Sequence, residues 1–526
     1  MLEIIQNKAM LLPKIQKLPA ASIVVLGLGV ENRQFLEWAI KVVGLNPKTF
    51  ILADQMQIST EKFQRMQFFD SQAGFERAQT YFGDNYLEAL GVESVEYVIK
   101  APGIWSEATP LQEFRTRRGA DRVVSSLHFF FEKFAPQIIG VSGTKGKTTT
   151  AGLIAHILNE LIGYEGIYCG NSTNISPYQF WDTLNPQIPK ESYFVIELSS
   201  FQLQDLGYSK LSPARAVLTN YFVDHLDQHA TKDEYWHAKD NIYLHQQEPR
   251  LFVTEQLPEY VQKRAQGIVT TALSETLLQP LRVPLLGEHN RTNLTLALMT
   301  IADVTADELG ELVTLEQNKI QQALDSFQNL PYRLELTREE IVSISLAGVA
   351  KRLRIRFIND GAATEPEAVS AAITAATERE NEYLWIQFTG KDKGVDPEPV
   401  ILELLHTQTQ NQLYRVDYCG EIGQRILQLT YEKMKVPLEV EREEFRTVAK
   451  EALESLEQIR LDFEAWLQET YTNLVSIEAE EESERIREAS EYTLNIVLSP
   501  CGSSFDEFKN YIERSEFWNT LVTNLK

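Results

Sequence analysis

The segment GVSGTKGKTTT, at residues 140–150, constrains the fold of this chain more than any other feature. An apolar run, QIIGVSG, enters it, and a stretch with Ile154, Ile157, Leu158 and Leu161 at helical spacing follows it. A strand that turns through glycines into a helix directs backbone N–H groups and the helix N-terminus at phosphate oxygens. The segment therefore predicts a phosphate loop within an α/β layer.

Two side chains of this loop have the chemistry that ATP binding requires. Lys147 can reach the β- and γ-phosphates, and the Thr148 hydroxyl can coordinate Mg²⁺. Val141 stands where the general pattern has its first glycine, but Gly143 supplies a further glycine inside the loop. We predict an ATP site formed by Gly143, Thr144, Lys145, Gly146, Lys147, Thr148 and Thr149.

A weaker glycine pattern, GLGVEN, lies at residues 27–32. Gly27 and Gly29 fit a dinucleotide-binding fingerprint, but Asn32 replaces its third glycine. Asp54 ends the next strand-like run, where its carboxylate could bind a ribose or a base. A structural turn and a strand-end carboxylate explain these residues equally well, so the sequence leaves both alternatives open.

Strand-like runs alternate with helical patterns along most of the chain, which predicts α/β layers with parallel sheets. A length of 526 residues suits two or three domains. We place the domains at residues 1–122, 123–331 and 332–526. The clearest strand-like runs are SIVVLGLG, TFILAD, EYVIKAPGI, QIIGVSG, FVIELSS, RAVLTN, RIRFIND, YLWIQFTG, LYRVDYCG and LNIVLSP, and NLTLALMTIA is the clearest helix.

An acidic helical insertion is predicted at about residues 445–490. From Phe445 to Trp466, apolar residues recur at steps of three and four, which predicts one amphipathic helix over residues 445–467. The run EAEEESERIRE follows it. A solvated helical elaboration is favoured over a partner-binding role.

The composition excludes several classes of protein. The balance of 50 basic against 74 acidic residues gives a net charge of −24, which repels nucleic acid. Cys169, Cys419 and Cys501 are too few and too widely spaced for a disulfide framework or a metal cluster. No run approaches the roughly 18 apolar residues of a membrane span, and the N-terminus lacks a signal peptide's apolar core. We expect a cytoplasmic protein without membrane insertion.

Nine blocks of the sequence, in order, resemble the Mur ligases. Within that family they are most similar to the branch that adds glutamate to a UDP-linked muramoyl-alanine. The resemblance implies a Rossmann-like UDP-binding domain, a central phosphate-loop ATPase domain with a mainly parallel sheet, and a C-terminal Rossmann-like domain. The blocks are GTKGKTT, VIELSSFQL, TNYFVDHLDQH, YWHAKDNIY, GEHNRTN, LPYRLE, INDGAAT, TGKDKGVD and SPCGSSFDEFKNYIER.

The resemblance also implies a reaction. ATP phosphorylates the terminal carboxylate of UDP-N-acetylmuramoyl-L-alanine, and the amine of D-glutamate then displaces phosphate, in peptidoglycan precursor synthesis. The implied cofactors are ATP, Mg²⁺ and a carbamylated Lys239, and the implied state is a monomer. Gly361 and Ala362 replace the family's usual Ser-Lys, which removes a cation on the amino-acid side. The alternatives are a related ligase for L-glutamate or a polyglutamate-type chain, and a non-catalytic nucleotide-binding homologue.

The family's functional residues can be carried over where the motifs match. Glu197 offers a hard oxygen ligand for Mg²⁺ at a strand end, and Lys393 offers the cation that a dicarboxylate needs. The implied catalytic residues are Lys147, Glu197, His225 and Lys239, and the implied metal ligands are Thr148, Glu197, His225 and Lys239. Further implied ATP contacts are Asn290, Asn293, Arg333 and Asp360. The substrate contacts are Gly27, Gly29, Asp54, Asn174, Ser199, Gln202, Thr364, Lys393, Ser504 and Tyr511.

Overall fold

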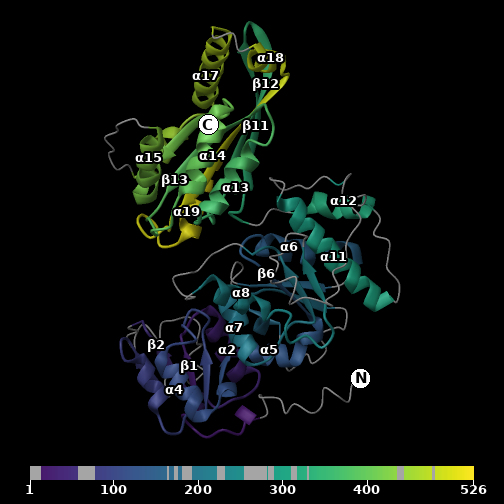
Figure 1. Cartoon of the computed structure of the whole chain (residues 1–526), viewed down its shortest axis with the longest axis vertical. Helices are drawn as coiled ribbons and strands as arrows, with labels where there is room; N and C mark the ends of the chain where they lie inside the picture. Colours follow the sequence, from purple (N-terminus) through teal and green to yellow (C-terminus); the bar gives the residue numbers. More distant parts are fainter. Residues whose placement is uncertain are drawn as a thin grey trace. The chain divides into compact units, whose positions relative to one another are not determined.

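Three sheets of five strands each organise the chain. Figure 1 shows the computed structural model, which falls into two compact units, Met1–Arg282 with Thr292–Ser326 and Val283–Arg291 with Phe327–Lys526. The first unit holds two of the sheets and the second unit holds the third. The structure describes residues 14–56, 78–162, 165–170, 176–180, 192–221, 231–253, 281, 289–309, 317–327, 331–434, 444–476 and 480–526.

The first sheet has the strand order β3-β2-β1-β4-β5, and all of its strands are parallel. The chain reverses its winding direction between β1 and β4, and open α/β sheets bind ligands at such a switch point. The glycine turn after β1 lies there. The strands are β1 (Ile23–Leu26), β2 (Phe50–Asp54), β3 (Gln79–Phe82), β4 (Tyr97–Lys100) and β5 (Val123–Ser125), and the helices are α2 (Val30–Lys41), α4 (Thr109–Arg118) and α5 (Leu127–Phe134).

The second sheet, also parallel, has the order β10-β9-β6-β8-β7. Its central strand, β6, pairs Val141 with Glu197 of β8 and Ser142 with Leu218 of β9, so the three carboxyl ends meet at one edge. The strands are β6 (Ile138–Ser142), β7 (Glu165–Cys169), β8 (Ser192–Glu197), β9 (Arg215–Leu218) and β10 (Leu251–Val253). The helices are α6 (Lys147–Ile157), α7 (Ser200–Tyr208), α8 (Lys232–Asp240), α11 (His289–Leu309) and α12 (Gln317–Ser326).

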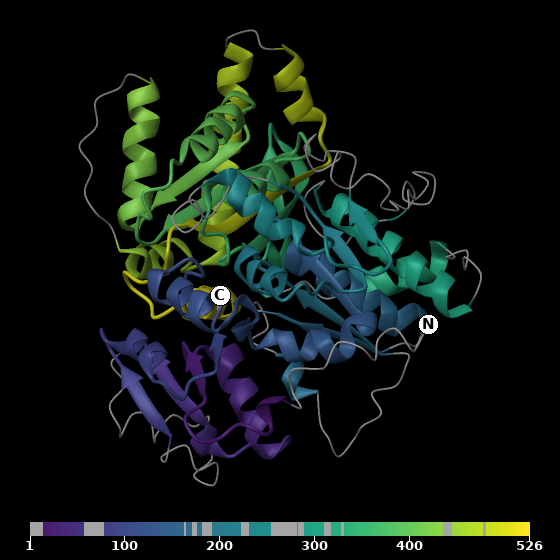
Figure 2. The ribbon, with the colours of Figure 1, turned by 60° about the horizontal axis from the view of Figure 1, so that its bottom comes forward.

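One apolar core joins these two sheets into the first unit. Phe35 and Trp38 of α2 belong to the same buried cluster as Phe130 of α5 and Phe194 of β8. Phe130 and Phe194 meet edge to face at 4.8 Å between ring centroids. Figure 2 shows the purple strands of the first sheet as a layer separate from the blue strands of the second. The shared core therefore fixes α2 and its glycine turn against the second sheet.

The third sheet, order β11-β12-β15-β13-β14, is parallel except for the antiparallel hairpin of β11 and β12. Side chains of β13 alternate between two cores: Tyr383 and Trp385 face one, and Leu384 and Ile386 face the other. The strands are β11 (Glu335–Leu346), β12 (Val349–Asn359), β13 (Glu382–Thr389), β14 (Leu413–Tyr418) and β15 (Glu491–Cys501). The helices are α13 (Pro366–Ala376), α14 (Glu398–Thr409), α15 (Gly420–Met434), α16 (Phe445–Ala452), α17 (Leu456–Ser476), α18 (Glu480–Glu488) and α19 (Tyr511–Asn524).

The prediction of a single amphipathic helix over residues 445–467 is wrong, because α16 and α17 are separate helices. Ser455 caps the start of α17, because its hydroxyl accepts the N–H of Gln458. The N–H of Leu456 is bound by the carbonyl of Lys526. Ala452 and Leu456 are four positions apart, so the apolar periodicity continues across the break and gives no sign of the helix cap.

The predicted α/β class with mainly parallel sheets is confirmed, and each clear strand-like run corresponds to a strand. The strands β3, β5, β7, β10 and β11 were not predicted. All five lie at the edges of their sheets, where fewer apolar residues are needed. The domain limits at residues 122 and 331 stay predictions.

Candidate active site

The predicted phosphate loop joins β6 to α6 and depends on two glycines. Gly143 has φ of 138°, and Gly146, which precedes the first residue of α6, has φ of 80°. A Cβ at Gly143 would lie 2.0 Å from Thr219 Oγ1, and one at Gly146 would lie 2.5 Å from Asn293 Oδ1. Both positions therefore require glycine for backbone conformation and for space.

Two lysines converge on the carbonyl of Gly143. The Nζ of Lys147 and the Nζ of Lys239 each donate to it at 2.9 Å, and Lys147 also donates to the Thr144 carbonyl at 2.9 Å. Lys239 is only 2% exposed and lies 4.6 Å from the centroid of the Tyr235 ring. The sequence thus brings two cations to the loop, where a triphosphate needs positive charge.

Asn220, at the end of β9, binds the loop through its carboxamide. Its Oδ1 accepts the N–H groups of Thr144 at 3.0 Å and Lys145 at 2.9 Å, and its Nδ2 donates to the Lys145 carbonyl at 3.0 Å. The Thr219 hydroxyl donates to the same carbonyl. The local sequence does not indicate this role, although both residues open the block TNYFVDHLDQH. Adjacent strand ends in a parallel sheet were the available signal.

Glu197 ends β8 beside the loop, and it is 6% exposed. The Tyr168 hydroxyl donates to its Oε1 at 2.7 Å. A carboxylate and the Thr148 hydroxyl are hard oxygen ligands, so this donor set fits Mg²⁺ chemically. Lys239 as an ammonium ion donates hydrogen bonds and is no ligand, and His225 lies outside the described residues. Among the described residues, no three His, Cys, Asp or Glu side chains are grouped as a metal cluster.

Two asparagines carried over as ATP contacts lie in the first turns of α11. Asn290 and Asn293 are both buried. The Oδ1 of Asn293 accepts the Thr150 hydroxyl at 3.2 Å, next to Gly146. The structure therefore brings Asn293 to the phosphate loop itself.

The glycine turn after β1 is closed by side chains of this chain. Gly27 has φ of 83°, and Gly29 precedes α2. The Asp54 carboxylate accepts the N–H of Leu28 at 2.5 Å and that of Met56 at 2.8 Å. Asn32 is fully buried, and its Nδ2 donates to the Gly27 carbonyl at 2.8 Å. Asn32 and Asp54 thus have structural roles in the turn.

Ser199 and Gln202 form a capping box at the start of α7. Ser199 Oγ accepts the N–H of Gln202 at 3.2 Å, and Gln202 Oε1 accepts the N–H of Ser199 at 2.9 Å. Gln202 Nε2 donates to Glu31 of α2 at 2.7 Å. The pKa of the Glu31 carboxyl is raised by burial, and hydrogen bonds from Ser126 and Gln202 oppose that rise. Asn174 lies outside the described residues.

In the second unit, the structure brings Thr364 and Lys393 together. Lys393 Nζ donates to Thr364 Oγ1 at 2.9 Å and to Glu365 Oε1 at 2.7 Å. A two-way backbone pairing of Lys391 with Ser503 places the loop of Lys393 beside the loop that holds the buried Ser504. These groups lie at the carboxyl edge of the third sheet.

Three other carried-over residues of the second unit have local roles. Asp360 follows β12, and its carboxylate accepts the N–H of Leu334 at 3.1 Å and the Ser499 hydroxyl at 2.9 Å. Arg333 is exposed, and the Tyr511 ring lies 6.3 Å from the Tyr332 ring. Asp360 therefore pins the segment that leads into the third sheet.

Gly361 explains one departure from the family pattern. A Cβ at this residue would lie 1.9 Å from Ser515 Oγ and 2.9 Å from Asn359 Oδ1, so a serine does not fit. Arg514 lies beneath the same edge, where its guanidinium donates to the carbonyls of Gly361 and Gly502 at 3.2 Å each. Burial lowers the pKa of Arg514 to about 10. This cation supports the glycine-rich edge from within.

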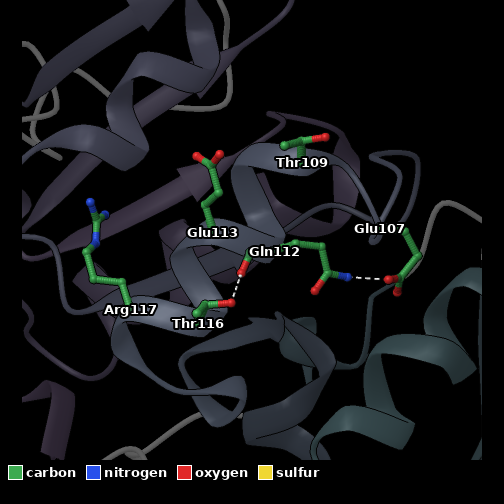
Figure 3. A pocket seen from close by; sticks show the side chains of 6 residues that line it. All are labelled: Glu107, Thr109, Gln112, Glu113, Thr116 and Arg117. Carbon is green, nitrogen blue, oxygen red and sulfur yellow. Dashed lines mark hydrogen bonds between the residues drawn. The ribbon is translucent and has the colours of Figure 1, made fainter.

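A broad surface hollow of about 400 Å³ lies along α4 (Figure 3). Glu107, Gln112, Glu113 and Arg117 are among its lining residues, and Gln112 donates to Glu107. One face of one helix and a short loop form it, and Glu107 also accepts the hydroxyl of Tyr208 in α7. The hollow is not part of the phosphate-loop site.

Comparisons with known proteins agree with the phosphate-loop chemistry. Residues 141–275 match the Mur ligase middle domain. UDP-N-acetylmuramoylalanine–D-glutamate ligase of Fusobacterium nucleatum is 25% identical over 465 residues, which cover 83% of this chain and 90% of that protein. UDP-N-acetylmuramoyl-L-alanine–L-glutamate ligase of Salinispora tropica is 28% identical over 459 residues, covering 84% and 85%.

A solved structure, the UDP-N-acetylmuramate–alanine ligase of Thermotoga maritima, aligns with a TM-score of 0.46 at 15% identity and covers 94% of this chain and 98% of that one.

Among the described residues, no helix is both long and apolar enough to cross a membrane.

The phosphate loop and these matches define the chain as an ATP-dependent ligase, which confirms the predicted class of enzyme. More narrowly, residues 141–275 match the Mur ligase middle domain, and the predicted resemblance to the Mur ligases is confirmed over most of the chain.

Proposed function

We propose that this ligase joins an amino acid, D-glutamate, to UDP-N-acetylmuramoyl-L-alanine in peptidoglycan precursor synthesis. The convergence of Lys147 and Lys239 on the phosphate loop carries the proposal, together with the likeness to D-glutamate ligases over 83% of the chain. We also propose that residues 1–122 bind the UDP moiety, 123–331 bind ATP, and 332–526 bind the amino acid.

The reaction follows from bringing two anions together. The substrate carboxylate attacks the γ-phosphorus, the bond to the bridging oxygen breaks, and ADP leaves with an acyl phosphate formed. The amine then attacks the acyl carbon, phosphate leaves, and the amine gives up a proton. Lys147 and the loop N–H groups hold the phosphates against their mutual repulsion. Thr148 and Glu197 would hold Mg²⁺, which supplies further positive charge when bound.

On the amino-acid side, the loops that carry Thr364, Lys393 and Ser504 supply a cation and hydroxyl donors suited to a dicarboxylate. L-Glutamate is the second candidate. Ligases for L-glutamate are 28% identical to this chain over a similar length, and Gly361 leaves no room for the family's usual serine. Ala362, which stands where the family usually has a lysine, likewise removes a cation from the amino-acid side of the site.

A phosphate-release assay with ATP, Mg²⁺ and UDP-muramoyl-alanine, run across D- and L-amino acids, tests the proposal. We expect release that depends on both substrates and is greatest with D-glutamate. Lys147→Ala should abolish it, because the loop loses its charge contact to the phosphates. Lys145→Ala, in the same loop, is the matched control and should retain more activity. Normal turnover of Lys147→Ala, or no release with any amino acid, would refute the assignment.

A further inference from the structure

The loop between β15 and α19 carries Ser504, one of the proposed amino-acid contacts. The chain enters this loop at Cys501, whose φ of 63° is a left-handed conformation that costs free energy in a residue with a side chain. The backbones of Ser503 and Lys391 exchange hydrogen bonds of 2.8 and 3.1 Å, and the N–H of Phe508 is donated to the Ser504 carbonyl at 3.0 Å. A strained backbone of this kind persists only where the surrounding structure holds it in place.

Glu507 joins this loop to the acidic insertion. Its two carboxylate oxygens accept the N–H groups of Phe445 at 2.8 Å and Arg446 at 3.1 Å, which are the first two residues of α16. Glu444, which precedes α16, makes no side-chain cap of its own. A carboxylate at a helix N-terminus satisfies donors that have no partner within the helix, and the helix dipole favours its charge. Glu507 therefore caps a helix whose first residue is 62 positions away in the chain.

Arg446 and an aromatic cluster attach α16 to the same part of the loop. The Arg446 guanidinium donates to the Glu507 carbonyl at 3.2 Å and lies 4.1 Å from the centroid of the Phe508 ring, within the range of a cation–π contact. Phe508 is 5% exposed and belongs to the same buried cluster as the fully buried Phe445. Because Phe508 is hydrogen-bonded to the Ser504 carbonyl, α16 fixes the end of the turn that begins at Ser504.

We propose that α16 of the acidic insertion positions the amino-acid loop, and that Glu507 is the positioning residue. Both oxygens of its carboxylate are bound to α16, so Glu507 acts through the loop and not on a substrate. By holding Phe508, it sets the turn that presents Ser504 to the incoming amino acid. This inference rests on the proposed function, in which the loops of Ser504 and Lys393 bind a dicarboxylate. The insertion is thereby a support of the amino-acid site and not a solvated elaboration alone.

Steady-state kinetics of the full-length ligase, with the amino acid that gives the greatest turnover, separate this role from stability. Glu507→Ala should raise the KM for the amino acid about tenfold, because a misplaced Ser504 no longer donates to a charged carboxylate. The KM for ATP should stay within about twofold, since the phosphate loop lies in the other unit. Glu464→Ala is the matched control. It also removes a carboxylate of the insertion that accepts a backbone N–H, that of Ser345, but at the hairpin end of β11 and away from the carboxyl edge. It should keep the wild-type KM for the amino acid.

A double-variant cycle shows whether Glu507 acts through Ser504. Ser504→Ala should itself raise the KM for the amino acid, and Glu507→Ala should raise it no further in that background, whereas independent effects would add. Glu507→Gln keeps one acceptor oxygen and should raise the KM about threefold, which gives the readout if Glu507→Ala does not fold.

The proposal is overturned by a wild-type KM in Glu507→Gln or in Ser504→Ala, by additive effects of the two alanine substitutions, or by an equal rise in Glu464→Ala. If the wild-type ligase releases no phosphate with any amino acid, the proposed function is refuted instead.

Discussion

The buried ion pair between Lys100 and Asp205 offers a sharp test of how the first unit is held together. Lys100 Nζ lies 2.9 Å from Asp205 Oδ2, and the two side chains are 1% and 3% exposed. Lys100 ends β4 of the first sheet, and Asp205 belongs to α7 beside the second. Lys100 also donates to the carbonyls of Ala101 and Ile104, and Ser106 donates to Asp205 at 2.6 Å.

Lys100→Met removes the ion-pair partner and leaves the buried Asp205 carboxylate with the hydrogen bond from the Ser106 hydroxyl and the weaker attraction of Arg115. Breaking a buried pair in this way costs about 3–5 kcal/mol. At about 2–4 °C per kcal/mol, the melting temperature of the first unit should fall by roughly 6–20 °C. Lys41→Met is the matched control, because the Lys41–Glu37 pair is 44% and 43% exposed. Its loss should cost less than about 1 kcal/mol.

The titration of Asp205 determines whether the free energy of unfolding rises or falls with pH. Burial raises its pKa in the folded state, and Lys100 opposes that rise. A carboxyl with a raised folded pKa contributes stability below its unfolded pKa and loses it as pH rises through the folded pKa. Without Lys100 the pKa of Asp205 in the folded state is higher still. Lys100→Met should therefore lower the free energy of unfolding more at about pH 8 than at about pH 5.5.

Scanning calorimetry at both pH values, with the Lys100→Met/Asp205→Leu double variant alongside, measures these terms. The double variant should recover much of the loss and its pH dependence, because neither charge of the pair remains buried. Recovery should be incomplete, since Ser106 and two carbonyls lose a partner. If Lys100→Met melted like Lys41→Met at both pH values, the ion pair would not hold the two sheets together.

Three further changes test other parts of the structure. Lys239→Ala should lose phosphate release. If Lys239 acts as a carbamate, a short-chain carboxylic acid or bicarbonate should restore part of that activity. Wild-type activity of the Lys239→Ala variant would contradict this role. Gly361→Ser should destabilise the second unit by about 1–3 kcal/mol through overpacking against Ser515, and Ser515→Gly should relieve it; equal melting curves for the single variant and the wild type would contradict the clash. Burial raises the pKa values of Cys169 and Cys501 to about 12, so native thiols should react with a thiol reagent near pH 8 far more slowly than in denaturant; equal rates would contradict their burial.

The parts that local sequence could predict are those in which one segment determines its own geometry. The phosphate loop is such a case, because β6, two glycines and α6 are consecutive in the chain. Asn220 could not be assigned in the same way. Its hydrogen bonds to Thr144 and Lys145 connect residues about 75 positions apart, and they exist because β6 and β9 are neighbours in the sheet.

The acidic insertion shows a different limit of sequence reasoning. Its apolar periodicity and acidic run predict a solvated helical elaboration. Phe445 of α16, Phe463 of α17 and Ile486 of α18 lie in the same core as Trp385 and Trp518 of the third sheet and α19. Side chains of α17 also bind the edge strand β11: Glu464 accepts the N–H of Ser345 at 2.9 Å. An amphipathic pattern records that a helix buries one face and does not record what it packs against.

The glycine turn after β1 explains why a partial motif does not identify a ligand. A dinucleotide fold uses its third glycine for close packing of helix on strand and leaves the turn N–H groups to the pyrophosphate. Here Asn32 occupies the helix position and ties it to the Gly27 carbonyl, while Asp54 takes the N–H of Leu28. A carboxylate at that donor repels a phosphate, so the Leu28 N–H of this turn is not offered to a pyrophosphate. A partial glycine motif thus records the shape of a strand-to-helix turn and does not record that Asp54 already binds one of its N–H donors.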